Sequence, residues 1–261
     1  MYIIAGIAFA STRLPSFSRR AKPLLALAFT SAVIALGWHA ISLWQVLTAG
    51  GGLHLSIGST ASVIGLQLAL IAVLGAVESS LRGLAGGLLI LGAFASAFLD
   101  PATPPAGAVT TMSWQIEAHI LISLFAYSLL SVGAIVAIYA LVQDHRLRAG
   151  QISPINRLFA PLETTERLLF GITAAGLSLL LLAVFSGFLF VDNLFAQHLV
   201  HKTALSLLAL VLFGILFAGR QFAGWRGQRA VYLYLWGFAV LCLAYFGSRY
   251  ILENLLGRSW S

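Results

Sequence analysis

Charged residues are scarce in this sequence of 261 residues, of which 9% are Asp, Glu, Lys or Arg and 60% are hydrophobic. Soluble domains carry about 25% charged residues, and the mean hydropathy here is +0.96. The composition therefore predicts an integral membrane protein. The formal net charge of +7 does not indicate nucleic acid as a partner, because the basic residues are spread over short loops and form no single patch.

Cysteine is nearly absent, since Cys242 is the single one. An internal disulfide, a CxxC redox pair and a thiolate metal cluster are therefore excluded, and the absence of CxxCH excludes covalent haem attachment. The sequence also has no glycine-rich phosphate loop, no HExxH and no paired carboxylates within its apolar segments. We therefore expect no catalytic residue and no enzyme, and intramembrane charges are too few for the relay of an ion pump.

Long apolar runs dominate what is present, and about 20 such residues cross the ~30 Å hydrocarbon core of a bilayer as a helix. The clearest run is uncharged from Ile120 to Val142. We predict an all-α, polytopic membrane helix bundle that forms one transmembrane domain over residues 1–261. It has eight helices, the first of them brief, at about 1–12, 23–47, 56–77, 83–99, 114–143, 168–190, 203–218 and 230–252.

The basic residues favour one side of the membrane. If alternate loops share a side, 12 of the 15 basic residues lie together, and the positive-inside rule makes that side cytoplasmic, with both termini outside a bacterial inner membrane. The longest polar loop on this side contains Leu158, Phe159, Leu162 and Leu169, which suggest a short surface helix, with an ordinary linker as the alternative. The 12 residues are Arg13, Arg19, Arg20, Lys22, Arg82, Arg146, Arg148, Arg157, Arg167, Arg220, Arg226 and Arg229.

Two histidines fall within predicted helices at matching depth. His39 lies about 24 Å from the cytoplasmic end of its helix and His119 about 8 Å from the outer end of its own, so both are in the outer third. Imidazoles on two helices can supply both axial ligands to the iron of a non-covalent b-type haem. Interhelical hydrogen bonds and snorkelling at the interface are the alternatives. His201, in an outer loop, is a third candidate for cofactor binding, with a solvated side chain as its alternative.

Five segments form a pattern when they are read together: HAISLW around His39, AHILISLFAYSLLSVGAIVAIYALVQ around His119, LETTERLLF from Leu162, GWRGQRA from Gly224 and AYFGSR from Ala244. Over about residues 38–249 they resemble the cytochrome c assembly protein family of haem-handling membrane proteins (the CcsA, ResC and CcmC group), most closely its small eight-helix YpjD-like and HemX-like branch. The resemblance implies that His119 is an external haem ligand. It also implies that His39 is the histidine typical of the second helix, and that the GWRG turn shapes an interface without touching haem.

The sequence departs from the large members of this family in two places. The external segment VDNLFAQHLVHKTALS has no tryptophan, and Ser248 and Arg249 stand where a second external histidine is expected. The resemblance therefore implies haem binding near the outer face and a part in haem handling or cytochrome c biogenesis, without the platform that presents haem to apocytochrome. The partners implied are the lipid bilayer and a haem-handling or other membrane protein. A cofactor-free scaffold or regulatory subunit acting through residues 144–167 is one alternative, and a small-solute transporter is another.

Overall fold

The computed structural model describes residues 1–48, 57–99, 113–150, 161–190 and 200–247. These ranges form helices joined by short turns and contain no strand, which confirms the prediction of an all-α protein. Within them, six helices are long and apolar enough to cross a membrane. The chain divides into two compact units, which are described separately. Unit 1 comprises Met1–Glu117 with Val142–Thr165, and unit 2 comprises Ala118–Leu141 with Glu166–Ser261. The single transmembrane domain stays a prediction.

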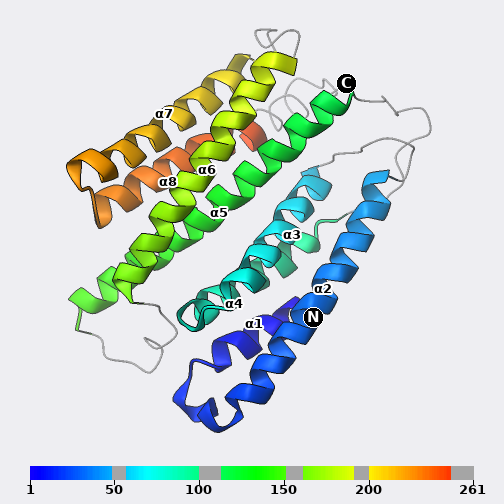
Figure 1. Cartoon of the computed structure of the whole chain (residues 1–261), viewed down its shortest axis with the longest axis vertical. Coiled ribbons are helices and arrows are strands. Elements are labelled where there is room, and N and C mark those ends of the chain that lie inside the picture. Colours follow the sequence, from blue (N-terminus) through cyan, green and yellow to red (C-terminus); the bar gives the residue numbers. More distant parts are fainter. Residues whose placement is uncertain (49–56, 100–112, 151–160, 191–199, 248–261) are drawn as a thin grey trace. The chain divides into compact units, whose positions relative to one another are not determined.

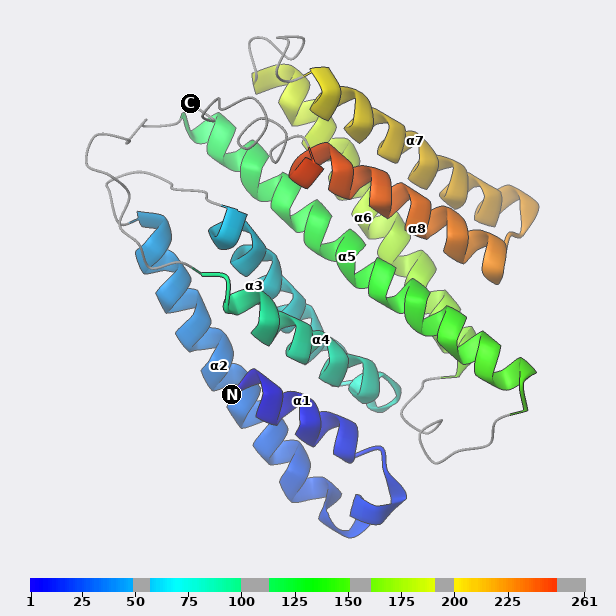
Figure 2. The same cartoon turned by 180° about the vertical axis from the view of Figure 1, so that it is seen from behind.

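Unit 1 contains the first four helices of the chain. Its helix α1 has 10 residues, about 15 Å, which is less than the hydrocarbon core of a bilayer and agrees with the prediction of a brief first helix. The turn between α1 and α2 and the turn between α3 and α4 lie at the same end of the unit (Figures 1 and 2), so the basic residues of both turns share that end. The elements are α1 (Tyr2–Ser11), η1 (Pro15–Arg20), α2 (Ala21–Thr48), α3 (Ile57–Gly75), η2 (Ser79–Leu81) and α4 (Arg82–Ser96).

Glycines bring the helices of unit 1 into close contact. Helix α4 packs against α1 and α3. A Cβ atom added to Gly6 of α1 would lie 2.7 Å from the carbonyl oxygen of Gly86 in α4, and a Cβ at Gly65 of α3 would lie 2.7 Å from the Cβ of Ala95. Only residues without a side chain fit at such distances, as is typical of helix contacts in membranes. The close approach predicted for the glycine-rich fourth helix is confirmed.

Unit 2 is built around a buried tyrosine on its last helix. The hydroxyl of Tyr234 donates a hydrogen bond to the backbone oxygen of Leu130 at 2.9 Å, and its ring contacts that of Phe213 with centroids 5.1 Å apart. All three residues are fully buried. The helices are the central part of α5 (Trp114–Arg148), α6 (Leu162–Phe190) from Glu166 onward, α7 (Val200–Ala223) and α8 (Gln228–Cys242), which continues as the π-helical turn η4 (Leu243–Gly247).

Three helices extend further than the hydropathy predicts. Helix α5 ends at Arg148 instead of residue 143, and Nε of Arg148 lies 3.0 Å from Oδ2 of Asp144, an i,i+4 pair that favours the helix. Helix α6 begins at Leu162 instead of residue 168, and α7 ends at Ala223 instead of residue 218. The reason is that hydropathy marks the edge of the bilayer, whereas a helix can continue into water.

The early start of α6 corrects one prediction. Leu162 and Leu169 belong to the long helix α6, so the separate surface helix predicted to include them is wrong for these two residues. Leu158 and Phe159 lie outside the described residues. A helix that begins in the polar loop and enters the membrane without a break needs no surface element to explain its leucines.

Large apolar side chains cover the outside of the molecule. Trp38, Trp236 and Phe185 are exposed over 75%, 68% and 59% of their surface, whereas much of the buried surface belongs to alanine and glycine. Water would make such a surface unstable, and the acyl chains of a bilayer would not. The chain is therefore a multi-pass membrane protein whose exposed apolar surface faces lipid.

Candidate functional site

His119 lies in the second turn of α5, at one end of unit 2. Its Nδ1 atom is 2.9 Å from the hydroxyl of Ser186, near the end of α6. A Cβ atom added to the next residue, Gly187, would lie 3.1 Å from Cε1 of the imidazole. The backbone of α6 therefore fixes the ring from one side, and the absence of a side chain at Gly187 leaves the ring its place.

The hydrogen bonds around His119 are compatible with one tautomer in particular. Oγ of Ser186 lies 2.9 Å from Nδ1 of His119 and 3.0 Å from the backbone oxygen of Ala183. A serine has one proton to donate, so when Ser186 donates it to Ala183, its oxygen accepts from Nδ1. The carbonyl of Ala183 is also within hydrogen-bonding range of the imidazole. In this tautomer Nε2 holds a lone pair, which is the form of histidine that binds a metal, with its other nitrogen oriented by a hydrogen bond.

His39 lies in unit 1 and has a different environment. It is 5% exposed, its Nδ1 is 3.1 Å from the hydroxyl of Tyr2 in α1, and its Nε2 is 2.7 Å from the hydroxyl of Ser62 in α3. Both ring nitrogens are thus engaged. Coordination of iron by His39 stays a prediction, and it would require the loss of one of these two hydrogen bonds. As it stands, the side chain joins α1, α2 and α3.

His201 is exposed near the start of α7, in the same unit as His119. Lys202, the next residue, is close enough for its charge to act on the His119 imidazole. Cofactor binding by His201 stays a prediction. Within the ranges that the structure covers, no group of three His, Cys, Asp or Glu side chains could hold a metal ion.

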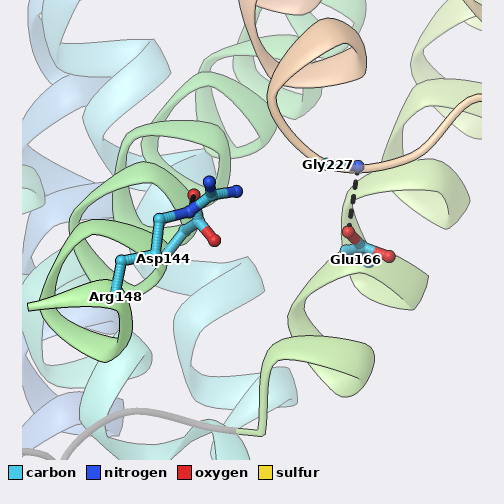
Figure 3. Close-up of polar contacts among 4 residues, drawn as sticks. All are labelled: Asp144, Arg148, Glu166 and Gly227. Carbon is cyan, nitrogen blue, oxygen red and sulfur yellow. Dashed lines mark hydrogen bonds and ion pairs between the residues drawn. The ribbon is translucent and has the colours of Figure 1, made fainter. Parts of the chain in front are cut away.

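The opposite end of unit 2 joins two of the segments that form the family pattern. Glu166, of the LETTERLLF segment, accepts a hydrogen bond from the backbone N–H of Gly227 at 3.0 Å (Figure 3), and this glycine caps the start of α8 with a φ of 63°. A carboxylate there also stabilises the positive end of the helix dipole. Glu166 and Ser186 are 20 residues apart on α6, about 30 Å, so the two polar ends of unit 2 are separated by about the thickness of a bilayer core.

The GWRG turn packs on the end of α7, and Arg220 of α7 contacts both this turn and α6. A Cβ at Gly219 would lie 2.3 Å from Cε3 of Trp225, so the indole covers the α7 backbone at this position. Arg220 donates a hydrogen bond to the backbone oxygen of Trp225 at 3.3 Å, and its guanidinium lies 4.5 Å from the ring centroid of Phe170. These contacts agree with the expectation that the turn shapes a helix interface. They fasten α8 to α6 and α7.

Comparison with known proteins now decides the family. The model of the family described as Cytochrome C assembly protein matches residues 27–256. The chain belongs to this family. It is also similar to the protein named Inner membrane protein YpjD of Escherichia coli K12, with 34% identity over 235 residues and 88% of each chain covered. A protein of Azospirillum brasilense, named Uncharacterized 28.8 kDa protein in nifR3-like 5'region, is 29% identical over 172 residues, which are 65% of this chain and 63% of that one. No solved structure matches.

Membership in the family confirms the resemblance seen in the sequence. Sequence reasoning found His119 but missed the residues that orient it, Ser186 and Gly187. A serine followed by a glycine is common in membrane helices, so the sequence held no signal for them. Glu166 belongs to the LETTERLLF segment of the family pattern. Its distance in sequence from the GWRG turn does not predict the hydrogen bond between Glu166 and Gly227.

Proposed function

We propose that this protein binds a b-type haem non-covalently through Nε2 of His119, and that it takes part in haem handling or cytochrome c biogenesis without being an enzyme. One observation carries the proposal. Oγ of Ser186 lies 2.9 Å from Nδ1 of His119, and an Nδ1 that donates to this serine leaves Nε2 with the lone pair that iron requires. The apolar faces of membrane helices suit the macrocycle of haem.

The residues of this chain fit one axial ligand directly. When bound, haem would supply an iron atom that accepts a nitrogen ligand on each side of its ring. His119 would provide one. His39 is the predicted second ligand, with both nitrogens engaged by Tyr2 and Ser62, and His201 is the other candidate, exposed near the start of α7. The proposal therefore ranks His119 first and leaves the second ligand to the experiment.

The proposed location is a bacterial inner membrane, with the 12 basic residues named in the sequence analysis on the cytoplasmic side, His119 near the outer face and both termini outside. The name of the Escherichia coli relative supports the inner membrane, and the distribution of basic residues supports the orientation. Haem bound there would lie near the outer side of the membrane.

The experiment is the absorption spectrum of the detergent-purified protein, oxidised and reduced, before and after addition of haem. We expect a Soret band and sharp reduced bands that are lost in His119→Ala. Matched variants His39→Ala and His201→Ala identify the second ligand, since only the residue that coordinates iron changes the positions of the bands. A protein that stays colourless and takes up no haem would overturn the proposal and favour the cofactor-free scaffold.

A further inference from the structure

Three cations of unit 1 have no partner in the part of the chain that the structure describes. Arg19 and Arg20 end η1, and Lys22 lies in the first turn of α2. All three side chains are exposed, and no hydrogen bond or ion pair joins them to another described residue. We call these three residues, together with Phe17 of η1, the η1 patch.

Other basic residues on the predicted cytoplasmic side are bound by the protein itself. Nε of Arg82 donates a hydrogen bond to the backbone oxygen of Ala76 at 3.2 Å, and Nε of Arg148 lies 3.0 Å from Oδ2 of Asp144. Such residues satisfy the positive-inside rule and stabilise the fold at the same time. The η1 patch contributes its charge without such a contact, so this charge is available to a ligand.

Acidic residues do not balance the η1 patch. In the two turns at this end of unit 1, residues 12–22 and 76–82, Glu78 is the single acid, and its carboxylate accepts a hydrogen bond from the backbone N–H of Ser80 at 3.4 Å. The first turn of α2 contains no acid, although the N-terminal end of a helix disfavours cations. The three cations therefore repel one another and the helix dipole until an anion binds.

An exposed aromatic ring lies in the same turn. Phe17 is 40% exposed, and η1 is a 3-10 helix, in which side chains three residues apart lie above each other. Phe17 therefore shares a face with Arg20. The turn lies at the end of α1 and α2 (Figures 1 and 2), where the hydrocarbon core of a bilayer meets the headgroups. A ring beside cations at this level suits a lipid better than a soluble anion or an acidic peptide, because the ring can contact the acyl chains while the cations reach the phosphate.

We propose that the η1 patch binds the headgroup of an anionic phospholipid, with the phosphate held by the three cations and the acyl chains in contact with Phe17. A guanidinium offers paired N–H donors to a phosphate, and an ammonium adds a compact charge. An anionic headgroup such as that of phosphatidylglycerol carries a net negative charge, whereas the headgroup of phosphatidylcholine is zwitterionic. The patch therefore distinguishes the two. This binding does not depend on haem.

A second exposed basic pair provides the matched control. Arg226 and Arg229, at the start of α8, are also exposed and have no partner among the described residues. They flank Gly227, whose backbone N–H donates to the carboxylate of Glu166 at 3.0 Å. That carboxylate offsets their charge and repels a phosphate, so we expect no headgroup preference from this pair. Its removal changes the net charge of the chain as much as the removal of Arg19 and Arg20.

The test uses the full chain, purified in a neutral detergent, with phosphatidylglycerol and phosphatidylcholine of identical acyl chains as probes. Native mass spectrometry measures the affinity for each lipid. A cation near an anionic headgroup contributes about 5-fold in affinity, so we expect the wild-type protein to prefer phosphatidylglycerol by about 100-fold. Arg19→Gln/Arg20→Gln should lower this preference by about 25-fold and Lys22→Gln by about 5-fold. Arg226→Gln/Arg229→Gln should keep the wild-type preference.

Two further measurements separate the parts of the patch from the fold. Phe17→Ser removes the apolar contact and should weaken the binding of both lipids by about 5-fold, while the preference for phosphatidylglycerol remains. Thermal unfolding in detergent without added lipid should be the same for the wild type and for Arg19→Gln/Arg20→Gln, because these side chains have no hydrogen bond or ion pair to lose within the described residues.

The proposal fails on any of four results. The first is equal wild-type affinity for the two lipids, and the second is an unchanged preference in Arg19→Gln/Arg20→Gln or, if that variant does not fold, in Lys22→Gln. The third is an equal loss in Arg226→Gln/Arg229→Gln, since the attraction would then come from net charge and not from the patch. The fourth is displacement of the lipid by an equal concentration of glycerol phosphate, which would assign the patch to a soluble anion.

Discussion

Replacement of Gly187 by alanine should shift the imidazole ring of His119 while leaving the histidine itself in place. The new Cβ would lie 3.1 Å from Cε1 of the imidazole, 3.7 Å from Nδ1 and 3.8 Å from Nε2. Carbon atoms pack best at about 3.5–4.0 Å, so the ring must move by about 0.4–0.9 Å. The hydrogen bond to Ser186 at 2.9 Å would lengthen or tilt with it. The direction of Nε2 would therefore change.

The effect of this movement on the affinity for haem can be bounded. Loss of the groups that orient a metal-binding histidine typically costs about 10-fold to 100-fold in metal affinity, and we expect Gly187→Ala to lower haem affinity by about 10-fold, at the lower limit of that range. The stability of the fold should change little, because alanine gains about 1 kcal/mol over glycine in a helix and this gain offsets part of the strain.

The matched control is Gly171→Ala on the same helix, since a Cβ there would meet no atom within 4 Å. The two variants are compared by haem titration and thermal unfolding in detergent. Gly171→Ala should keep the haem affinity and gain stability. Gly187→Ala should lose haem affinity while its stability changes little. Wild-type affinity in Gly187→Ala would refute the reasoning, because it would show that the position of the His119 ring does not matter for haem.

Three further predictions concern stability and are checked by thermal unfolding in detergent. Ser62→Ala leaves a buried nitrogen of His39 without its partner at 2.7 Å and should cost about 1–3 kcal/mol; an unchanged midpoint would contradict this. Glu166→Ala removes the acceptor at the α8 cap and should cost about 0.5–1 kcal/mol more than Glu166→Gln, which keeps an acceptor; equal midpoints would speak against the cap. Gly133→Ala places a Cβ 1.9 Å from the Tyr234 hydroxyl and should cost about 1–3 kcal/mol. Adding Tyr234→Phe should recover part of that loss, and additive losses would disprove the contact.

The helices could be predicted from the sequence because apolar length is a one-dimensional signal. A span is recognised from about 20 consecutive apolar residues alone, without knowledge of what they contact, and the run from Ile120 to Val142 meets this criterion. The start of the same helix at residue 114 was predicted correctly, but its end at Arg148 was not. Arg148 and Asp144 form an i,i+4 pair that favours the helix beyond the apolar run. A hydropathy profile predicts a loop at such a pair, because both residues are charged.

The candidate site was predictable only in its central residue. A histidine inside an apolar helix is costly and therefore noticeable, which is why His119 and His39 both stood out. Their difference depends on partners from other helices, which are Ser186 and the Ala183 carbonyl of α6 for His119, and Tyr2 and Ser62 for His39. Such partners are distant in the sequence, and serine and tyrosine are common enough in membrane helices to carry no signal of their own.

The end of α8 shows the same limit for the backbone. The sequence predicts one helix at about 230–252, whereas the structure has the π-helical turn η4 after Cys242. At this point the hydroxyl of Tyr127 in α5 donates a hydrogen bond to the backbone oxygen of Leu241 in α8. No property of the α8 sequence announces this hydrogen bond, because the group that donates it comes from another helix.

The central claim is that Nε2 of His119 coordinates haem iron, and replacement of the side chain by free imidazole tests it most directly. His119→Gly should leave space for the missing ring, bind haem weakly, and regain the wild-type Soret and reduced bands when imidazole is added. The control His201→Gly should show no such dependence on imidazole unless it supplies the second ligand, in which case the bands change in position. A His119→Gly variant that binds haem with wild-type affinity and spectrum in the absence of imidazole would contradict the account.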